Sequence, residues 1–353
     1  MNSKNNYIRD FVGVTDWHEA GYTGSRVHAL TGERLEGEFV TEHGLNTRDV
    51  FFEFAPDATL TYLAAPMASN TAPNFAENKG DACVMFVSLS SSGSNGATYA
   101  DPVIPDDIFI AMSAGNEGTT SSNGWIKAEK VYGVGAVNLK WSAMRNGEPM
   151  PGAELMIFSA SYTSESNHVD FGAPTDIYID NRHDAFGGTS GAAPALAGIV
   201  ALVQDLFIEK TGRPLSHQAM YQFLKDNSMD IEETGKDNRS GWGLPILPDP
   251  ATVDVWKYQT LPSIEEIPAP EKEPVPEVES TPEEVPEINI VEPNPIPPEE
   301  STSDGTLHID AYVFSYDKFV EYMNKYNNEH AMSLGEIFKE FARRLKTYFK
   351  SNN

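Results

Sequence analysis

The chain has 353 residues, with 25 Lys and Arg against 52 Asp and Glu, a formal net charge of -27 and a single cysteine. This length allows one large domain or two ordinary ones. The charge excludes a nucleic-acid binder driven by electrostatics and disfavours an acidic lipid surface, because both need clustered Lys and Arg. One cysteine excludes an internal disulfide and a Cys-rich zinc site, so Cys83 is expected to be a buried thiol.

The first residues of the chain lack the apolar stretch of a secretory signal. No apolar run is expected to be long enough to span a bilayer. The sequence therefore predicts a protein with no membrane partner that is either cytoplasmic or exported by a route that the sequence does not show.

Residues 1–250 have the mixed composition of an α/β domain, with Gly-rich turns, helical segments and a β-rich apolar run at 108–112. The composition then changes abruptly. Between Pro262 and Glu300 there are eleven prolines and twelve glutamates against one lysine, and such a segment cannot bury enough apolar surface to fold. We therefore expect a disordered, acidic, Pro-rich linker over residues 251–306.

Apolar periodicity returns in residues 307–353. A capping-box pattern at Ser333–Glu336 opens a run whose apolar residues recur at helical spacing, and basic residues gather near its C-terminal end. The pattern predicts an amphipathic helix over 334–349 in a small helical appendage. Its apolar face either packs within the appendage or docks with a partner or a second copy of the chain.

The strongest chemical signal is a turn of small residues from Gly187 that leads into an apolar helix. This pattern places Ser190 at the N-terminus of the helix, where free backbone N–H groups and the helix dipole stabilise a developing oxyanion. A nucleophilic serine needs that environment. The alternative is a tight turn in which Ser190 is only the N-cap residue.

The segment 188–194, Gly-Thr-Ser-Gly-Ala-Ala-Pro, closely resembles the nucleophile motif of the subtilisin-like serine proteases, the subtilases. Residues 114–118, Ala-Gly-Asn-Glu-Gly, look like the oxyanion-hole motif of that family. His43-Gly44, followed by Ala-Pro-Asp-Ala at 55–58, is similar to its catalytic histidine region. The resemblance covers about residues 11–250, and it implies a subtilisin-like three-layer α/β sandwich with a mainly parallel central sheet.

The resemblance also implies roles for single residues. Ser190 would form the acyl-enzyme, His43 would act as general base, and Asn116 would bind the oxyanion together with the Ser190 N–H. An extended peptide substrate would add a strand to the sheet at Ser88, Leu89, Ser90 and Ser91. Structural calcium is possible in the family, but its ligands cannot be assigned in so acidic a sequence, and no other cofactor is expected.

The catalytic aspartate of the family is missing from its motif. The preceding Gly-Tyr-Thr-Gly turn is present at 21–24, but one alignment puts Leu30 in the place of the aspartate and another puts Glu33 there. Asp16 is a third candidate because of a strand-like approach, and it ranks below Glu33. This carboxylate orients the histidine, and its loss lowers turnover by about 10⁴.

Two functions remain open at this stage. The first is a serine endopeptidase that hydrolyses peptide bonds in peptide or protein substrates, with basic or neutral peptides favoured by the negative charge of the enzyme. The alternative is a catalytically impaired pseudoprotease that serves as a binding or structural module, and the degenerate aspartate motif favours it. No long propeptide is visible, which suits a cytoplasmic or a phage- or virion-associated enzyme.

Overall fold

The computed structural model describes residues 1–66, 72–89, 101–120, 123–145, 148–180, 182–259, 307–309 and 312–314. The chain divides into two units, Met1–Pro274 and Val275–Asn353. In the second unit, β12 (Leu307–Ile309) and β13 (Tyr312–Phe314) form an antiparallel pair. Of the linker predicted at 251–306, residues 251–259 are described and contain helical elements, whereas residues 260–306 and the predicted helix at 334–349 lie outside the described residues.

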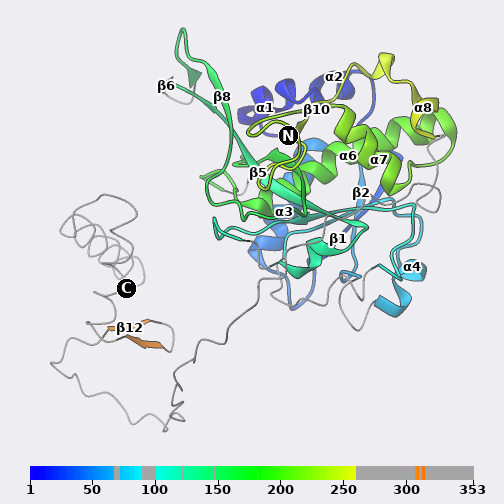
Figure 1. Cartoon of the computed structure of the whole chain (residues 1–353), viewed down its shortest axis with the longest axis horizontal. Helices are drawn as coiled ribbons and strands as arrows, with labels where there is room; N and C mark the ends of the chain where they lie inside the picture. Colours follow the sequence, from blue (N-terminus) through cyan, green and yellow to red (C-terminus); the bar gives the residue numbers. More distant parts are fainter. Residues whose placement is uncertain are drawn as a thin grey trace, which may run out of the picture. The chain divides into compact units, whose positions relative to one another are not determined.

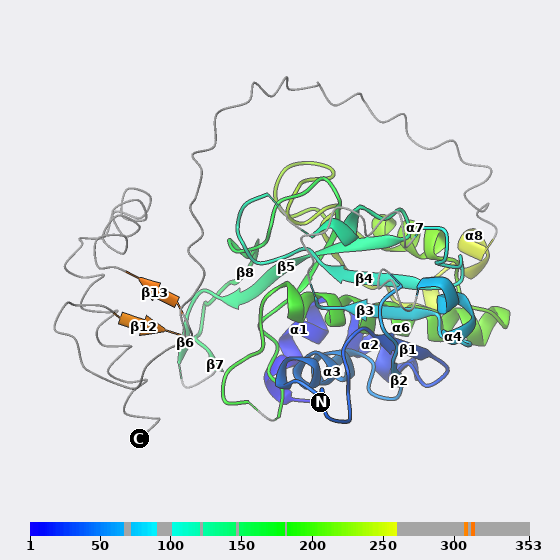
Figure 2. The same ribbon diagram turned by 90° about the horizontal axis from the view of Figure 1, so that it is seen from below.

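A seven-stranded sheet forms the centre of the first unit (Figures 1 and 2). The strand order is β2-β1-β3-β4-β5-β8, and β9 also pairs with β5. The strands are β1 (His28–Thr31), β2 (Thr59–Tyr62), β3 (Val84–Val87), β4 (Phe109–Ser113), β5 (Val131–Trp141), β8 (Leu155–Ser159) and β9 (Val169–Pro174). Only the β5–β8 pairing within this sheet is antiparallel, so the prediction of a mainly parallel sheet is confirmed.

Hydrophobic cores cover both faces of the sheet. Side chains of a strand alternate between faces, and in β3 Val84 and Phe86 belong to one core whereas Met85 and Val87 belong to the other. Strands buried on both sides have continuous apolar sequences, which explains the run predicted at 108–112. Cys83 is buried beside β3, as expected, and this burial raises the pKa of its thiol to about 12.

Helices and 3₁₀ segments complete the two outer layers. The larger core is covered by α1 (Asn6–Phe11), α2 (Val14–Glu19), α3 (Glu42–Phe54), α6 (Thr189–Thr211) and α7 (His217–Asp226). The smaller core is closed by α4 (Phe75–Asn78), which follows the 3₁₀ segment η2 (Ala72–Asn74), and by the 3₁₀ segment η3 (Gly124–Lys127). The remaining short elements are η1 (Ser3–Asn5), β6 (Met144–Arg145), β7 (Glu148–Pro149), β10 (Ser228–Met229), β11 (Leu244–Pro245), η4 (Pro250–Thr252) and α8 (Val255–Gln259).

Helix α6 is almost wholly buried against the sheet and α3. Among the described residues it is the one helix whose length and composition would suffice to cross a membrane. The expectation that no apolar run has this length was therefore wrong for residues 189–211. The physical reason is that burial in a protein core selects the same apolar composition as burial in lipid.

A buried carboxylate on α6 holds the turn that precedes β1. Asp205 Oδ2 accepts hydrogen bonds from the backbone N–H groups of Thr23, Gly24 and Ser25 at 2.9–3.2 Å. Its Oδ1 accepts from Nη1 of Arg26 at 2.9 Å. The turn therefore has a structural partner that is independent of catalysis, and it fixes where β1 begins.

The folded part of the first unit continues past the composition change near Pro250. The side chain of Tyr258 on α8 is buried against Phe223 and Phe207, with ring centroids 5.1 and 6.4 Å apart. Next to it, Nζ of Lys257 lies 2.7 Å from a carboxylate oxygen of Asp226. One aromatic ring and one ion pair thus anchor a helix that overall composition does not reveal.

Candidate active site

Residues that sequence reasoning singled out gather at one edge of the sheet. Glu33 follows β1, Ser88 follows β3 and Asn116 follows β4. Because these neighbouring strands are parallel, their carboxyl ends meet at the same edge, where ligands bind in open α/β sheets. His43 lies in the first turn of α3, and Ser190 is the second residue of α6.

Glu33 is hydrogen-bonded to His43. Nδ1 of His43 lies 2.8 Å from Oε2 of Glu33, whose side chain is only 5 % exposed. Gly44 makes room for this longer acid, because an added Cβ there would lie 3.1 Å from Oε2 and 3.2 Å from Cβ of Glu33. The other carboxylate oxygen, Oε1, is buried and has no hydrogen-bond partner within the described part of the chain.

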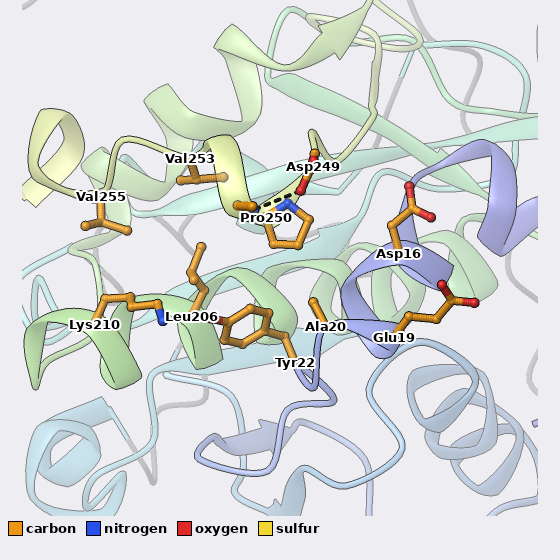
Figure 3. Close-up of a pocket in the computed structure, with 11 residues that line it drawn as sticks. Asp16, Glu19, Ala20, Tyr22, Leu206, Lys210, Asp249, Pro250, Val253 and Val255 are labelled. Carbon is orange, nitrogen blue, oxygen red and sulfur yellow. Dashed lines mark hydrogen bonds between the residues drawn. The ribbon is translucent and has the colours of Figure 1, made fainter.

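The other two candidates for the acidic position lie elsewhere. Leu30 is buried inside β1. Asp16 is on α2, so the strand-like approach predicted for it was wrong. It lines a surface pocket of about 560 Å³ whose wall includes Glu19 and Lys210 (Figure 3). Among the three, only Glu33 has a hydrogen bond or ion pair to His43 in the described structure.

The turn before α6 presents Ser190 at the helix N-terminus. The N-cap residue is Gly188, with φ 80° and ψ 171°, so the alternative role of Ser190 as N-cap does not hold. Ser190 Oγ lies 3.5 Å from the carbonyl oxygen of Ser88, and Ser88 Oγ donates to the Ser190 carbonyl at 3.0 Å. These contacts join the end of β3 to the turn.

Two N–H donors belong to the residues at the turn before α6. Oδ1 of Asn116 accepts from the backbone N–H of Thr189 at 2.8 Å and from its hydroxyl at 3.1 Å. This pairing fixes the amide so that Nδ2 is the outward-facing donor. Neither Nδ2 of Asn116 nor the Ser190 N–H has an acceptor among the residues whose placement is described.

His43 and Ser190 are not hydrogen-bonded to each other in the described structure. The ring of Phe186 packs edge-on against His43, with ring centroids 5.6 Å apart. Contacts between nucleophile and base are often long in a substrate-free site and tighten when substrate binds. With Nδ1 bonded to Glu33, the free ring nitrogen of His43 is Nε2.

The predicted substrate-binding segment is described only in part. Ser88 is buried against α6, whereas the side chain of Leu89 is 41 % exposed. Ser90 and Ser91 lie outside the described residues. No cluster of three or more His, Cys, Asp or Glu side chains suited to a metal occurs within the described ranges.

Sequence reasoning missed two residues that contact the nucleophile turn, Tyr162 and Thr175. Both hydrogen-bond to Gly188, although they lie 26 and 13 residues away in the chain. The sequence contains no local motif that marks them, because the fold alone brings them to the turn.

Comparison with known proteins agrees with this arrangement. The model of the subtilase family matches residues 69–243. Similar solved structures include the prenylagaramide maturation protease PagA, with a TM-score of 0.50, 15% identity, and coverage of 70% of this chain and 97% of that chain. A lanthipeptide protease has a TM-score of 0.45 and 17% identity over 69% of this chain and 89% of that chain. The PatG macrocyclase in complex with peptide has a TM-score of 0.48 and 14% identity over 72% of this chain and 98% of that chain.

At 15% identity, the PagA structure shows a common fold and no more. The family match includes the segments around Asn116 and Ser190. Residues 69–243 of the chain therefore form a subtilase-family region.

Proposed function

We propose that this protein is a serine endopeptidase in which Ser190 is the nucleophile, His43 the general base and Glu33 the acid that orients His43. The observation that carries the proposal is the 2.8 Å contact between His43 Nδ1 and the buried carboxylate of Glu33. This contact supplies a carboxylate where the family motif lacks its aspartate. The argument for a pseudoprotease rested on that missing aspartate.

The first half of the reaction is acylation. Nε2 of His43 takes the proton from Ser190 Oγ as the oxygen attacks the scissile carbonyl. The negative charge that develops on the carbonyl oxygen receives hydrogen bonds from Nδ2 of Asn116 and from the Ser190 N–H. Glu33 holds the imidazole in the required tautomer and stabilises the imidazolium.

The second half regenerates the enzyme. The imidazolium of His43 gives its proton to the leaving amine as the C–N bond breaks, which leaves an ester on Ser190. Water then attacks the ester, with His43 again taking and returning a proton. An extended peptide that pairs as a strand with the segment beginning at Ser88 would place its carbonyl over Ser190.

The test is covalent labelling with a fluorophosphonate probe, which requires an activated serine and no knowledge of the substrate. We expect the wild-type protein to be labelled and the variants Ser190→Ala and His43→Ala to remain unlabelled at the same protein and probe concentrations. Hydrolysis of a mixed peptide library, read by mass spectrometry, then shows whether labelling reflects endopeptidase activity. A folded wild-type protein that is not labelled would favour the pseudoprotease instead.

A further inference from the structure

The backbone of Gly188 has a conformation that the surrounding structure must hold in place. Its φ of 80° and ψ of 171° lie in a region that essentially only glycine adopts. An added Cβ at this position would also lie 3.3 Å from Oδ1 of Asn116. The backbone conformation of Gly188 sets the direction of the N–H groups of Thr189 and Ser190. This one residue therefore orients the N-terminus of α6.

Two hydroxyl side chains bind the polar groups of Gly188. The Gly188 N–H donates to the Tyr162 hydroxyl at 3.1 Å, and the Thr175 hydroxyl donates to the Gly188 carbonyl at 2.9 Å. The two hydroxyl oxygens lie 3.4 Å apart. A threonine hydroxyl has one hydrogen, and that hydrogen is given to Gly188. Tyr162 is therefore the donor to Thr175, and the three residues form a closed ring of hydrogen bonds with one direction.

Tyr162 also reaches the other half of the oxyanion site. Its carbonyl oxygen accepts from the N–H of Gly118 at 2.8 Å, two residues beyond Asn116. Asn116 in turn binds Thr189. The backbone of Tyr162 thus supports the loop that carries one donor, while its side chain supports the turn that carries the other.

We propose that Tyr162 and Thr175 are positioning residues, which set the spacing between Asn116 Nδ2 and the Ser190 N–H by fixing Gly188. The proposal rests on the function proposed above. It is distinct from that function because neither side chain is hydrogen-bonded to Ser190 or His43 in the described structure, and neither exchanges a proton with substrate. Misplacement of catalytic groups by about 1 Å costs on the order of 10²-fold in rate.

The experiment compares four variants of the full chain with the wild-type protein. Tyr162→Phe and Thr175→Val each open the hydrogen-bond ring with little change in shape, whereas Thr175→Ser keeps the hydroxyl. Tyr7→Phe is the matched control, because the Tyr7 hydroxyl, like that of Tyr162, is hydrogen-bonded to the main chain: it donates to the carbonyl of Leu139 at 3.0 Å. Each protein is assayed for peptide hydrolysis per active site titrated with the fluorophosphonate, for inhibition by a peptide boronic acid, and for thermal unfolding.

We expect Tyr162→Phe and Thr175→Val to lower kcat by about 10- to 100-fold with KM nearly unchanged, since only oxyanion stabilisation is lost. Affinity for the boronic acid, which mimics the tetrahedral intermediate, should fall by a similar factor. Thr175→Ser and Tyr7→Phe should stay within about twofold of the wild-type kcat.

A lower melting temperature with unchanged kcat per titrated site would overturn the proposal, because it would mean a purely structural role. The same conclusion follows if Thr175→Ser is as slow as Thr175→Val. If the wild-type protein itself is not labelled, the proposed function fails, and the positioning role fails with it. That outcome is distinguishable because it is seen before any variant is compared.

Discussion

The contact between Glu33 and His43 depends on the one methylene by which glutamate is longer than aspartate. It leads to the sharpest prediction at the scale of the residue. Glu33→Gln should lower kcat by about 10³- to 10⁴-fold, because an amide favours the wrong tautomer of His43 and cannot stabilise the imidazolium. Glu33→Asp should also be slow, since the shorter side chain does not reach Nδ1 at the present 2.8 Å. Steady-state kinetics on a cleaved peptide measure both effects.

Asp16→Asn is the control for this prediction, because Asp16 lies on α2 beside a separate pocket. It should keep the wild-type kcat. A Glu33→Gln variant with wild-type kcat would show that His43 works without this carboxylate.

A second prediction at the scale of the residue concerns His217 and the pH dependence of the free energy of unfolding. Its burial, and after that the nearby charge of Lys130, lower its pKa to about 4 from the usual 6.5. Between these two values the unfolded chain binds a proton at His217 that the folded chain does not bind. The stability contributed by neutral His217 is therefore present above pH 6.5 and is lost as the pH falls towards 4, with a slope of up to about 1.4 kcal/mol per pH unit.

Urea unfolding of the wild-type protein and of His217→Gln between pH 4 and 7 measures this contribution. The variant loses the packing and hydrogen bond of the imidazole beside Tyr132, so it should be less stable at pH 7. The difference in free energy of unfolding between the variant and the wild-type protein should become smaller towards pH 4. Burial also lowers the pKa of His18, but both proteins share that effect, so parallel curves would contradict the assignment to His217.

At the scale of the element, the crossing of α3 and α6 brings His43 and Ser190 into one site. An added Cβ at Gly198 would lie 2.5 Å from Cβ of Phe54 and 3.0 Å from the carbonyl oxygen of Phe51. Gly198→Ala should therefore push the helices apart, lower the free energy of unfolding by about 1–3 kcal/mol and lower kcat as well. Urea unfolding and kinetics on the same preparation measure both.

Lys210→Ala, on the exposed last turn of the same helix, is the matched control. It should change stability by no more than about 0.5 kcal/mol. Equal stability of Gly198→Ala and the wild-type protein would mean that the helices have room to separate without cost.

At the scale of the whole molecule, the end of the folded part can be tested by truncation. A chain that ends at Gln259 should unfold at nearly the same urea concentration as the full chain. A chain that ends at Pro250 should lose about 2–4 kcal/mol, because the ring of Tyr258 no longer fills its site against Phe207 and Phe223. Tyr258→Ala in the full chain separates this loss from other effects of truncation, and it should reproduce most of it.

The parts of the fold that the sequence predicted are those governed by local patterns. The apolar run at 108–112 is a buried strand, and the small-residue turn does place Ser190 at the start of a helix. Counting residues from Gly24 placed Glu33 at the position of the family aspartate, and Glu33 is the candidate that is hydrogen-bonded to His43. In each case, burial or residue spacing produces a pattern that is visible in neighbouring residues of the sequence.

The parts that the sequence did not predict depend on contacts between distant segments. Helix α2 begins after Gly13, whose φ is 78°, and a run of only six residues around Asp16 has too little periodicity to distinguish a helix from a strand. Helix α8 is held because its Tyr258 ring packs against Phe207 and Phe223, which come from elsewhere in the chain. Tyr162 and Thr175 reach Gly188 only once the sheet has formed.

The burial of α6 has a consequence for the order of events during synthesis. A 23-residue apolar helix that leaves the ribosome uncovered is a substrate for membrane insertion or aggregation. The main surfaces that bury it, strands β3, β4, β5 and β9 and helix α3, all precede it in the chain. When α6 emerges, the segments that bury it have already been synthesised, so the direction of translation itself protects this apolar helix.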